Sequence, residues 1–222
     1  MYEVKVLFDG YSGIKEDGYY ANCTCTLLKG PQNIIVDTLT PWDGEKLRAA
    51  LNQHQLECED IQYVICTHGH SDHTGCNYLF PKAKLIVGYC ISFKDRYFDH
   101  NFKDGETYKI NEFVKVLPTP GHTMEDVSLL VETKNKGCIA ITGDLFEREE
   151  DIIDESIWQS AGSMDVILQS KNRYKILEIA DWIIPGHGPM FKVLEEYRVK
   201  GYGDKVPNTS DNSESSTTLE NM

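Results

Sequence analysis

Apolar and polar residues alternate along the first part of the chain, which is the pattern of strands with one buried face. Val4, Val6 and Phe8 share one face of the first such segment. A turn at Lys29-Gly30-Pro31-Gln32 separates the second segment from the third. The predicted strands occupy residues 2–9, 19–28 and 33–37. The pattern therefore predicts a β-meander.

Helical spacing of apolar residues begins after Asp43, where Leu47, Ala50 and Leu51 recur on one face. His54 continues this face, and we expect it to be a helix-surface or packing residue. The later predicted elements are strands 61–66, 84–88, 106–110, 112–117, 127–132, 137–142 and 182–184, and helices 74–80 and 164–180. Each half of the chain is thus a run of strands followed by a helix. This order indicates an α/β (α+β) sandwich of two mixed β-sheets flanked by helices.

In two segments the apolar residues show neither strand nor helix spacing. Residues 91–105 hold four aromatic side chains among polar groups, which suits a cover over an active site, a dimer contact or a packed surface loop. Residues 201–222 contain almost nothing apolar, so we expect a disordered tail there and one hydrolase domain over residues 1–200.

Composition is ordinary for a globular chain of 222 residues, with 41% hydrophobic and 26% charged residues. No apolar run approaches the ~20 residues of a membrane helix, and the N-terminal segment is too short and too alternating for a secretory signal. We expect no membrane partner and a protein that is not secreted. Seven cysteines form no framework spacing, so we expect reduced and mostly buried thiols.

The formal charge is −13, which argues against broad nucleic-acid binding. We expect no basic patch, and the densest basic run, Lys171-Asn172-Arg173-Tyr174-Lys175, is interpreted as a solvated helix face. Two bound divalent cations would still make a site that attracts an anion.

The segment that carries chemistry is Thr67-His68-Gly69-His70-Ser71-Asp72-His73, directly after a buried strand. In extended chain the rings of His68 and His70 leave on the same side. Three further candidates follow glycine at strand ends, where glycine lets the backbone turn close beside a ligand. They are His122, Asp144 and His187. The pattern predicts a pair of divalent metals rather than chance clustering.

These residues, in this order, resemble the metallo-β-lactamase superfamily. The resemblance implies the αββα metallo-β-lactamase fold and two Zn²⁺ ions. It implies a first metal held by His68, His70 and His122, a second held by Asp72, His73 and His187, and Asp144 bridging both. Iron or manganese stays open on ligand chemistry alone, but His70 stands where redox diiron relatives tend to carry an acidic residue, which disfavours a redox role.

Two neighbouring metals can lower the pKa of a shared water to give a bridging hydroxide, so the predicted reaction is hydrolysis. We expect Asp72 and Asp144 to be the catalytic carboxylates. Glu147 and His100 are candidates for the acid that protonates the leaving group. Asp37, at the end of a strand, is expected to accept capping or supporting hydrogen bonds and not to be a ligand.

The substrate is less constrained by these residues. The 35 residues after His187 leave no room for the helical substrate domain of glutathione-thioester hydrolases, and no second domain is inserted as in large RNA-processing nucleases. We therefore expect loops 91–105 and 145–162, or a partner subunit, to hold the substrate.

A closer likeness, to a compact animal branch of the superfamily, appears in four segments: residues 67–73, Gly143-Asp144-Leu145-Phe146-Glu147-Arg148, Trp158-Gln159 and residues 185–193. The Phe-Glu-Arg after Asp144 and the isolated Trp-Gln are the parts that narrow the likeness to this branch. This closer resemblance implies a homodimeric endoribonuclease that cleaves histone pre-mRNA near its 3′ end, in nucleus and cytosol. One alternative is a small-molecule ester or thioester hydrolase of the glyoxalase-II type. Another is a non-catalytic, metal-dependent regulatory protein.

Overall fold

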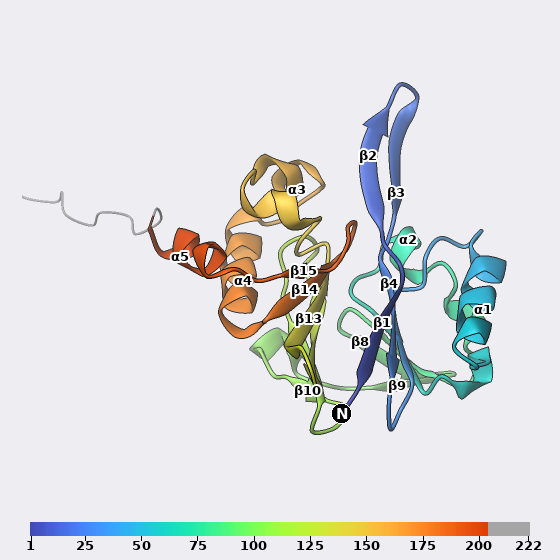
Figure 1. Cartoon of the computed structure of the whole chain (residues 1–222). Helices are drawn as coiled ribbons and strands as arrows, with labels where there is room; N and C mark the ends of the chain where they lie inside the picture. The colour runs from blue at the N-terminus through green and yellow to red at the C-terminus, as the bar shows by residue number, and fades with distance from the viewer. Residues whose placement is uncertain (204–222) are drawn as a thin grey trace, which may run out of the picture.

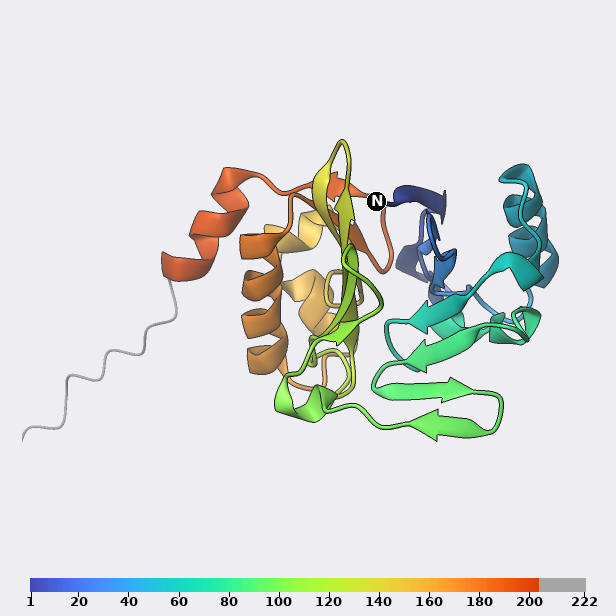
Figure 2. The same ribbon diagram turned by 90° about the horizontal axis from the view of Figure 1, so that it is seen from below.

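Two β-sheets lie face to face, and helices cover the outer side of each (Figures 1 and 2). The computed structural model describes residues 1–203. Most of the tail predicted over residues 201–222 therefore lies outside the described residues, while residues 201–203 belong to the last helix.

The first sheet has seven strands in the order β1-β4-β5-β6-β7-β8-β9. Its central pairs, β5 with β6 and β6 with β7, are parallel, so these three strands deliver the chain to the same edge. The strands span Glu3–Phe8 (β1), Cys25–Lys29 (β4), Ile34–Val36 (β5), Tyr63–Cys66 (β6), Lys84–Val87 (β7), Cys90–Phe93 (β8) and Arg96–Phe98 (β9).

The second sheet has six strands in the order β10-β11-β12-β13-β14-β15. Its only parallel pair among the described strands is β13 with β14. The strands span Tyr108–Lys109 (β10), Val114–Pro118 (β11), Val127–Thr133 (β12), Gly137–Gly143 (β13), Trp182–Pro185 (β14) and Phe191–Lys192 (β15).

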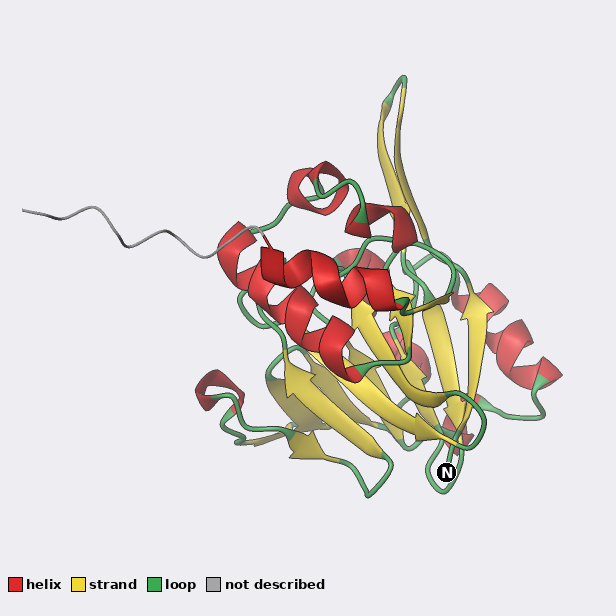
Figure 3. Cartoon of the chain, turned by 60° about the vertical axis from the view of Figure 1, so that its left-hand side comes forward, coloured by secondary structure: helices red, strands yellow, loops and turns green. Residues whose placement is uncertain are grey.

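Helices lie outside the two sheets (Figure 3). The α-helices span Gly44–Gln53 (α1), Ser71–Thr74 (α2), Ser156–Ser160 (α3), Val166–Ile179 (α4) and Glu195–Gly203 (α5). Short 3₁₀ turns span Cys58–Asp60 (η1), Asn77–Leu79 (η2), Phe102–Asp104 (η3) and Glu149–Ile152 (η4).

Three apolar clusters hold these layers together. The central cluster joins the inner faces of the two sheets through residues such as Ile65 and Leu129. A second cluster packs the first sheet against α1, with Leu47 buried, and a third packs the second sheet against α4, with Ile176 buried. The arrangement confirms the predicted αββα sandwich, because each sheet buries both of its faces.

A two-stranded hairpin projects from this body, formed by β2 (Tyr11–Lys15) and β3 (Gly18–Asn22) (Figures 1 and 3). Gly18 closes its turn at φ +149°, a conformation that favours glycine. The prediction of one strand over residues 19–28 was wrong, because the strand is interrupted at Cys23 and Thr24: β3 pairs with β2 in the hairpin, whereas β4 pairs with β1 and β5 in the first sheet. A side chain at Gly10 would collide there with Thr24 and Gly186, which pack against the base of the hairpin.

Three other predictions differ from the structure. The helix predicted over residues 74–80 begins earlier, at Ser71, and ends in a separate 3₁₀ turn. Residues 91–105 are not a loop throughout, since β8, β9 and η3 occupy much of the segment. The run 171–175 is not a solvated face as a whole: Lys171 and Lys175 are exposed, but Arg173 is buried in an ion pair with Asp151.

The described residues contain no helix long and apolar enough to cross a membrane. The seven cysteines carry free thiols, and five of them are buried, as expected. Burial raises the pKa of the Cys66 thiol, which keeps it protonated.

Candidate metal centre

The predicted metal ligands meet at the edge of the sandwich where parallel strands of both sheets end. His68 follows β6, Asp144 follows β13, and His187 follows β14. Since β13 and β14 are parallel neighbours, their C-terminal ends place Asp144 and His187 side by side. Loops at strand ends position ligands on a rigid scaffold in this way.

Four side chains form the first cluster, with their ligand atoms within 4.8 Å of one another. Nδ1 of His70 lies 2.8 Å from Nε2 of His68 and 3.2 Å from Nε2 of His122. Oδ2 of Asp144 lies 3.3 Å from Nε2 of His122 and 3.7 Å from Nε2 of His68. A tetrahedral cation with bonds of about 2.1 Å needs donors about 3.4 Å apart, so this set fits zinc.

The second cluster consists of Asp72, His73 and His187. Oδ2 of Asp72 lies 3.8 Å from Nε2 of His73 and 3.9 Å from Nε2 of His187. Asp144 also faces this cluster, because its Oδ1 lies 3.1 Å from Nε2 of His73 and its Oδ2 lies 3.2 Å from Nε2 of His187. One carboxylate is therefore shared by the two clusters.

Backbone and carboxylate acceptors orient the rings of the second cluster. Nδ1 of His73 donates to Oδ2 of Asp37 over 2.9 Å. Nδ1 of His187 donates to the carbonyl oxygens of Tyr11 and Asn22, at 3.1 and 3.0 Å, which form the base of the β2–β3 hairpin. Each ring thus presents Nε2 to the cluster, which is the usual support for a metal-binding histidine.

Several polar atoms of the clusters are buried with no hydrogen-bond partner among residues 1–203. They are Oδ2 of Asp72, Nε2 of His73 and Oδ1 of Asp144. Buried polar groups are normally paired, and these three atoms face one another at the second cluster, so they indicate a group bound between them. The donor set of imidazoles and carboxylates fits divalent cations.

Glycines allow this close approach. Gly143 adopts φ +52°, and a side chain there would collide with Thr67. A side chain at Gly186 would collide with Oδ1 of Asp144. Gly143 and Gly186, which precede Asp144 and His187, are therefore required by the geometry of the site.

Burial and charge set the protonation of the cluster. Burial opposes the charge of Asp144, but the surrounding histidines, first of all His187, outweigh it and hold the pKa of Asp144 well below its usual value. Burial lowers the pKa of His68 well below its usual value, which keeps this ring neutral. Burial also opposes protonation of His187, yet the Asp144 carboxylate raises the pKa of His187 to about 9. An anionic carboxylate therefore lies at the centre of the site.

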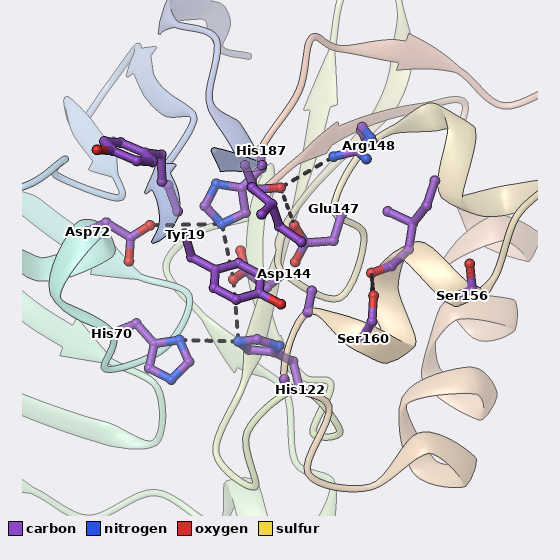
Figure 4. A pocket seen from close by; sticks show the side chains of 18 residues that line it. Tyr19, His70, Asp72, His122, Asp144, Glu147, Arg148, Ser156, Ser160 and His187 are labelled. Atoms are coloured by element: carbon purple, nitrogen blue, oxygen red, sulfur yellow. Dashed lines mark hydrogen bonds and ion pairs between the residues drawn. The ribbon is translucent and has the colours of Figure 1, made fainter. Parts of the chain in front are cut away.

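A cavity of about 790 Å³ opens over the clusters (Figure 4). His70, Asp72, His122, Asp144 and His187 form its floor. Walls come from the β2–β3 hairpin on one side and from helix α3 on the other. Its volume is within the range of small-molecule and substrate sites in proteins.

The hairpin wall was not foreseen from the sequence. Ser12, Ile14, Tyr19 and Ala21 share one face of the hairpin, because Ser12 pairs with Ala21 and Ile14 pairs with Tyr19, and all four line the cavity. The Ser12 hydroxyl donates to Oε2 of Glu147 over 2.9 Å, which ties this face to the site. The Asp17-Gly18 pair between alternating segments is the sequence signal that predicts such a hairpin.

The two candidates for the acid that protonates the leaving group lie in different places. Glu147 lines the cavity, is buried with its carboxylate near Asp144 and His187, and has a pKa raised to about 7, first by burial and then by Asp144. His100 does not line it and instead packs against Phe102 and Tyr108. No residue of the aromatic segment 91–105 lines the cavity, whereas the predicted substrate loop 145–162 contributes Glu147, Arg148 and five residues between 156 and 162 to the lining.

His54 ends helix α1 and belongs to neither cluster. Arg148 lines the cavity, and its guanidinium donates to Ser12 Oγ over 3.3 Å. Among the described residues, Arg148 is the one cationic side chain other than histidine in that lining.

Comparison with known sequences places these features in a family context. A family model described as the metallo-beta-lactamase superfamily matches residues 19–222. The chain is 41% identical over 197 residues to metallo-beta-lactamase domain-containing protein 1 of Xenopus laevis, which covers 87% of this chain and 83% of that protein. The Homo sapiens protein of the same name is 40% identical over 171 residues, and the match spans 76% of this chain and 62% of the human protein.

Solved structures share the fold. A Thermotoga maritima protein of the metallo-beta-lactamase kind matches with a TM-score of 0.64 at 25% identity, over 86% of this chain and 99% of that chain. A dizinc quorum-quenching lactonase in complex with its product, N-hexanoyl-L-homoserine, matches with a TM-score of 0.56 at 18% identity, over 78% of this chain and 75% of that chain.

Proposed function

The chain belongs to the metallo-beta-lactamase superfamily, and we propose that it is a binuclear metal-dependent hydrolase that cleaves phosphodiester bonds of single-stranded RNA. The observation that carries the hydrolase is the Asp144 carboxylate, which two neighbouring ligand clusters share beneath one cavity. We assign His68, His70 and His122 to one zinc ion, Asp72, His73 and His187 to the other, and Asp144 to both.

When bound, two divalent cations lower the pKa of a water between them and polarise the oxygen of the bond under attack. The residues of the chain prepare this reaction. Asp37 and the hairpin carbonyls hold the rings of His73 and His187 in place. Asp72 lines the cavity and is placed to accept a proton from the attacking water. Glu147, with its raised pKa, is placed to return a proton to the leaving group.

Three features support RNA as the substrate. The sequence likeness to the animal relatives, through the motifs around Asp144 and His187, implies an endoribonuclease acting on histone pre-mRNA. Tyr19 is 80% exposed on the cavity wall, where an unpaired base can stack on its ring. Arg148 lines the same cavity, with its guanidinium donating to Ser12 Oγ, and offers a cation to a phosphate.

The proposal includes a homodimer that acts in nucleus and cytosol, where pre-mRNA and its products occur. Sedimentation of the purified protein tests the first part, and immunofluorescence with fractionation tests the second. A monomer at micromolar concentration, or exclusion from the nucleus, would contradict the corresponding part.

A second candidate is hydrolysis of a small ester, thioester or lactone. The specific observation in its favour is the apolar character of the facing cavity walls, with Ile14 on the hairpin and Ile157 and Ala161 at helix α3. The structural likeness to a quorum-quenching lactonase points the same way. A non-catalytic regulatory protein is the weakest alternative, because a full set of seven candidate ligands is retained.

Cleavage of labelled single-stranded RNA from a histone pre-mRNA 3′ region tests the proposal. Zinc-loaded wild type and Asp144→Ala are compared, and a panel of small thioesters and N-acyl homoserine lactones runs in parallel. We expect the wild type alone to cut the RNA. Intact RNA with rapid turnover of a small ester would replace the proposal by the second candidate.

A further inference from the structure

A second groove lies at the other end of the sandwich, beside the N-terminal end of β1. It has a volume of about 440 Å³ and is lined by four lysines: Lys5, Lys29, Lys134 and Lys136. Glu3 is the one acidic residue of its described lining. In a chain with a formal charge of −13, this local excess of positive charge departs from the expectation that there is no basic patch.

The four lysines come from three separate parts of the chain. Lys5 lies on β1 and Lys29 at the end of β4, and these strands pair with Glu3 opposite Lys29. Lys134 and Lys136 lie in the turn between β12 and β13. A β-bridge between Tyr2 and Thr133 joins the two sheets here and brings the turn beside β1. We call this set the lysine groove.

The floor of the lysine groove is a fixed structure. Tyr2 is buried, and its hydroxyl accepts a hydrogen bond of 2.8 Å from the Asn111 side chain. Gly30 has no side chain, which leaves room for the Tyr2 ring, since a Cβ atom there would lie 2.6 Å from that ring. The lysines above this floor are therefore held on a rigid support.

Three of the four lysines make a contact through the ammonium group, but an ammonium has three N–H donors, so donors remain for an anion. Lys5 pairs with Glu3 at 2.6 Å, and Lys29 donates to the carbonyl oxygen of His54. The ammonium of Lys136 lies 3.8 Å from the centre of the Trp182 ring, a contact that keeps its charge. Glu3 thus offsets one of four positive charges, and the groove keeps a net positive potential.

We propose that the lysine groove binds phosphate groups of the RNA backbone at a distance from the bond that is cleaved. This inference rests on the proposed function. The lysine groove explains how an acidic protein, with one arginine in the described lining of its catalytic cavity, can hold a polyanion. Contacts of lysine and arginine with phosphates supply most of the sequence-independent affinity for nucleic acid.

Strand β1 sets the separation of the two sites. It runs for six residues from the lysine groove toward Gly10, which packs against Gly186 next to the metal centre. At about 3.3 Å per residue this strand spans roughly 20 Å. Figure 1 shows the N-terminus at the end of the sheets opposite the β2–β3 hairpin and α3. A dinucleotide is therefore too short to contact more than the metal centre, whereas a long RNA can contact the metal centre and the lysine groove at the same time.

Fluorescence anisotropy with labelled single-stranded RNA, in chelator so that no cleavage occurs, tests the groove directly. We compare wild type with Lys134→Gln/Lys136→Gln, two exposed turn residues, and with Lys171→Gln/Lys175→Gln on α4 as a matched loss of charge. Each lysine that contacts a phosphate of single-stranded RNA contributes about 0.7 to the slope of log affinity against log salt. We expect the groove variant to lower that slope by about 1.4 and the α4 variant to leave it unchanged. Glu3→Gln is expected to tighten binding.

Cleavage assays then separate this inference from the proposed function. The groove variant is expected to lose kcat/KM on long RNA and to match wild type on a dinucleotide. Equal salt slopes for the two lysine variants, or equal losses on long RNA and dinucleotide, would overturn the lysine groove. RNA bound through the groove but not cut by zinc-loaded wild type would overturn the proposed function instead. Complete competition by inorganic phosphate at equal phosphate concentration would mark a small-anion site and likewise overturn the RNA assignment.

Discussion

Nδ1 of His73 lies 2.9 Å from Oδ2 of Asp37, and this contact turns Nε2 of the same ring toward Asp144. Asp37 also accepts a hydrogen bond of 2.8 Å from the backbone N–H of Thr67, the residue that precedes His68. One buried carboxylate thereby supports a ligand of each cluster. The expectation that Asp37 accepts supporting hydrogen bonds agrees with this geometry.

Replacement of Asp37 by asparagine should weaken cation binding. Asparagine tolerates the left-handed backbone at this position, φ +56°, but removes the negative charge that holds the His73 ring. We expect zinc affinity to fall by about 10- to 100-fold, the usual cost of losing such a partner. Competition with a chromophoric chelator measures it. Asp60→Asn is the matched control, because Asp60 also accepts a backbone N–H but lies outside the ligand clusters. Equal affinities of the two variants would contradict the assigned support.

Replacement of Asp144 by alanine should remove most bound metal from both clusters, because its two oxygens face ligands of each. Metal content by inductively coupled plasma mass spectrometry gives the readout. His54→Ala and His100→Ala, which alter histidines outside the clusters, should retain the wild-type content. Near-equal zinc in Asp144→Ala and wild type would refute the bridging role.

Tyr19 should contribute to RNA binding through its ring. Loss of base stacking costs about 1–3 kcal/mol per base, so Tyr19→Ala should lower kcat/KM on RNA accordingly, while Tyr19→Phe stays near wild type. The free energy of unfolding should hardly change, because the side chain is 80% exposed. Tyr97→Ala removes a similarly exposed ring, 72%, from the far edge of the first sheet. An equal effect of the two alanine variants would exclude a specific role for Tyr19.

Asp126 should make the stability of the metal-free protein fall as pH rises. Burial raises the pKa of Asp126 from 3.8 to about 7, although Thr123 donates two hydrogen bonds to it. The folded state therefore holds the proton more tightly than the unfolded state. The stabilising effect of this protonation is complete below about pH 4 and is lost as pH rises through about 7. The free energy of unfolding then falls by at most about 1.4 kcal/mol per pH unit.

Urea denaturation in chelator between pH 4 and pH 8 measures this dependence. Asp126→Asn has no proton to lose, so its profile should be flatter over the same interval. Parallel profiles of the variant and the wild type would show that Asp126 is ionised throughout the interval.

Arg173 should be among the costliest polar side chains to remove. Arg173 is 5% exposed, and its guanidinium pairs with Asp151 at 2.6 Å and lies over the rings of Phe146 and Trp158. Removal leaves the buried Asp151 carboxylate without its cationic partner, although the backbone N–H of Glu147 still donates to it, and breaking a buried ion pair in this way typically costs about 3–5 kcal/mol. Chemical denaturation of Arg173→Met measures the loss. Lys171→Ala, on the same helix but exposed, should stay within about 0.5 kcal/mol of wild type, and a comparable loss there would contradict this account.

Local signals in the sequence were sufficient for the sandwich and for the members of the candidate site. His122, Asp144 and His187 each directly follow a glycine at a strand end, and the other four candidates lie in the loop and short helix after β6, so their positions along the chain also specified their place at one edge of the sheets. The strands could be predicted because each strand buries one or both faces. Burial of a face requires apolar residues at regular positions, and these positions are visible in the sequence. The hydrolase class followed from the resemblance and the donor types together, because imidazoles and carboxylates suit zinc and two neighbouring cations can activate a water molecule.

Tertiary contacts decided the rest. Residues 11–22 leave the sheet as a hairpin because Gly10, Thr24 and Gly186 pack together, and no local pattern records that contact. Arg173 is buried because Asp151, 22 positions away, faces it. The lysine groove exists because the Tyr2–Thr133 bridge brings together segments that are separated by more than a hundred residues. Periodicity reports which face of an element is buried, but the partner that buries it is set by the packing of the whole chain.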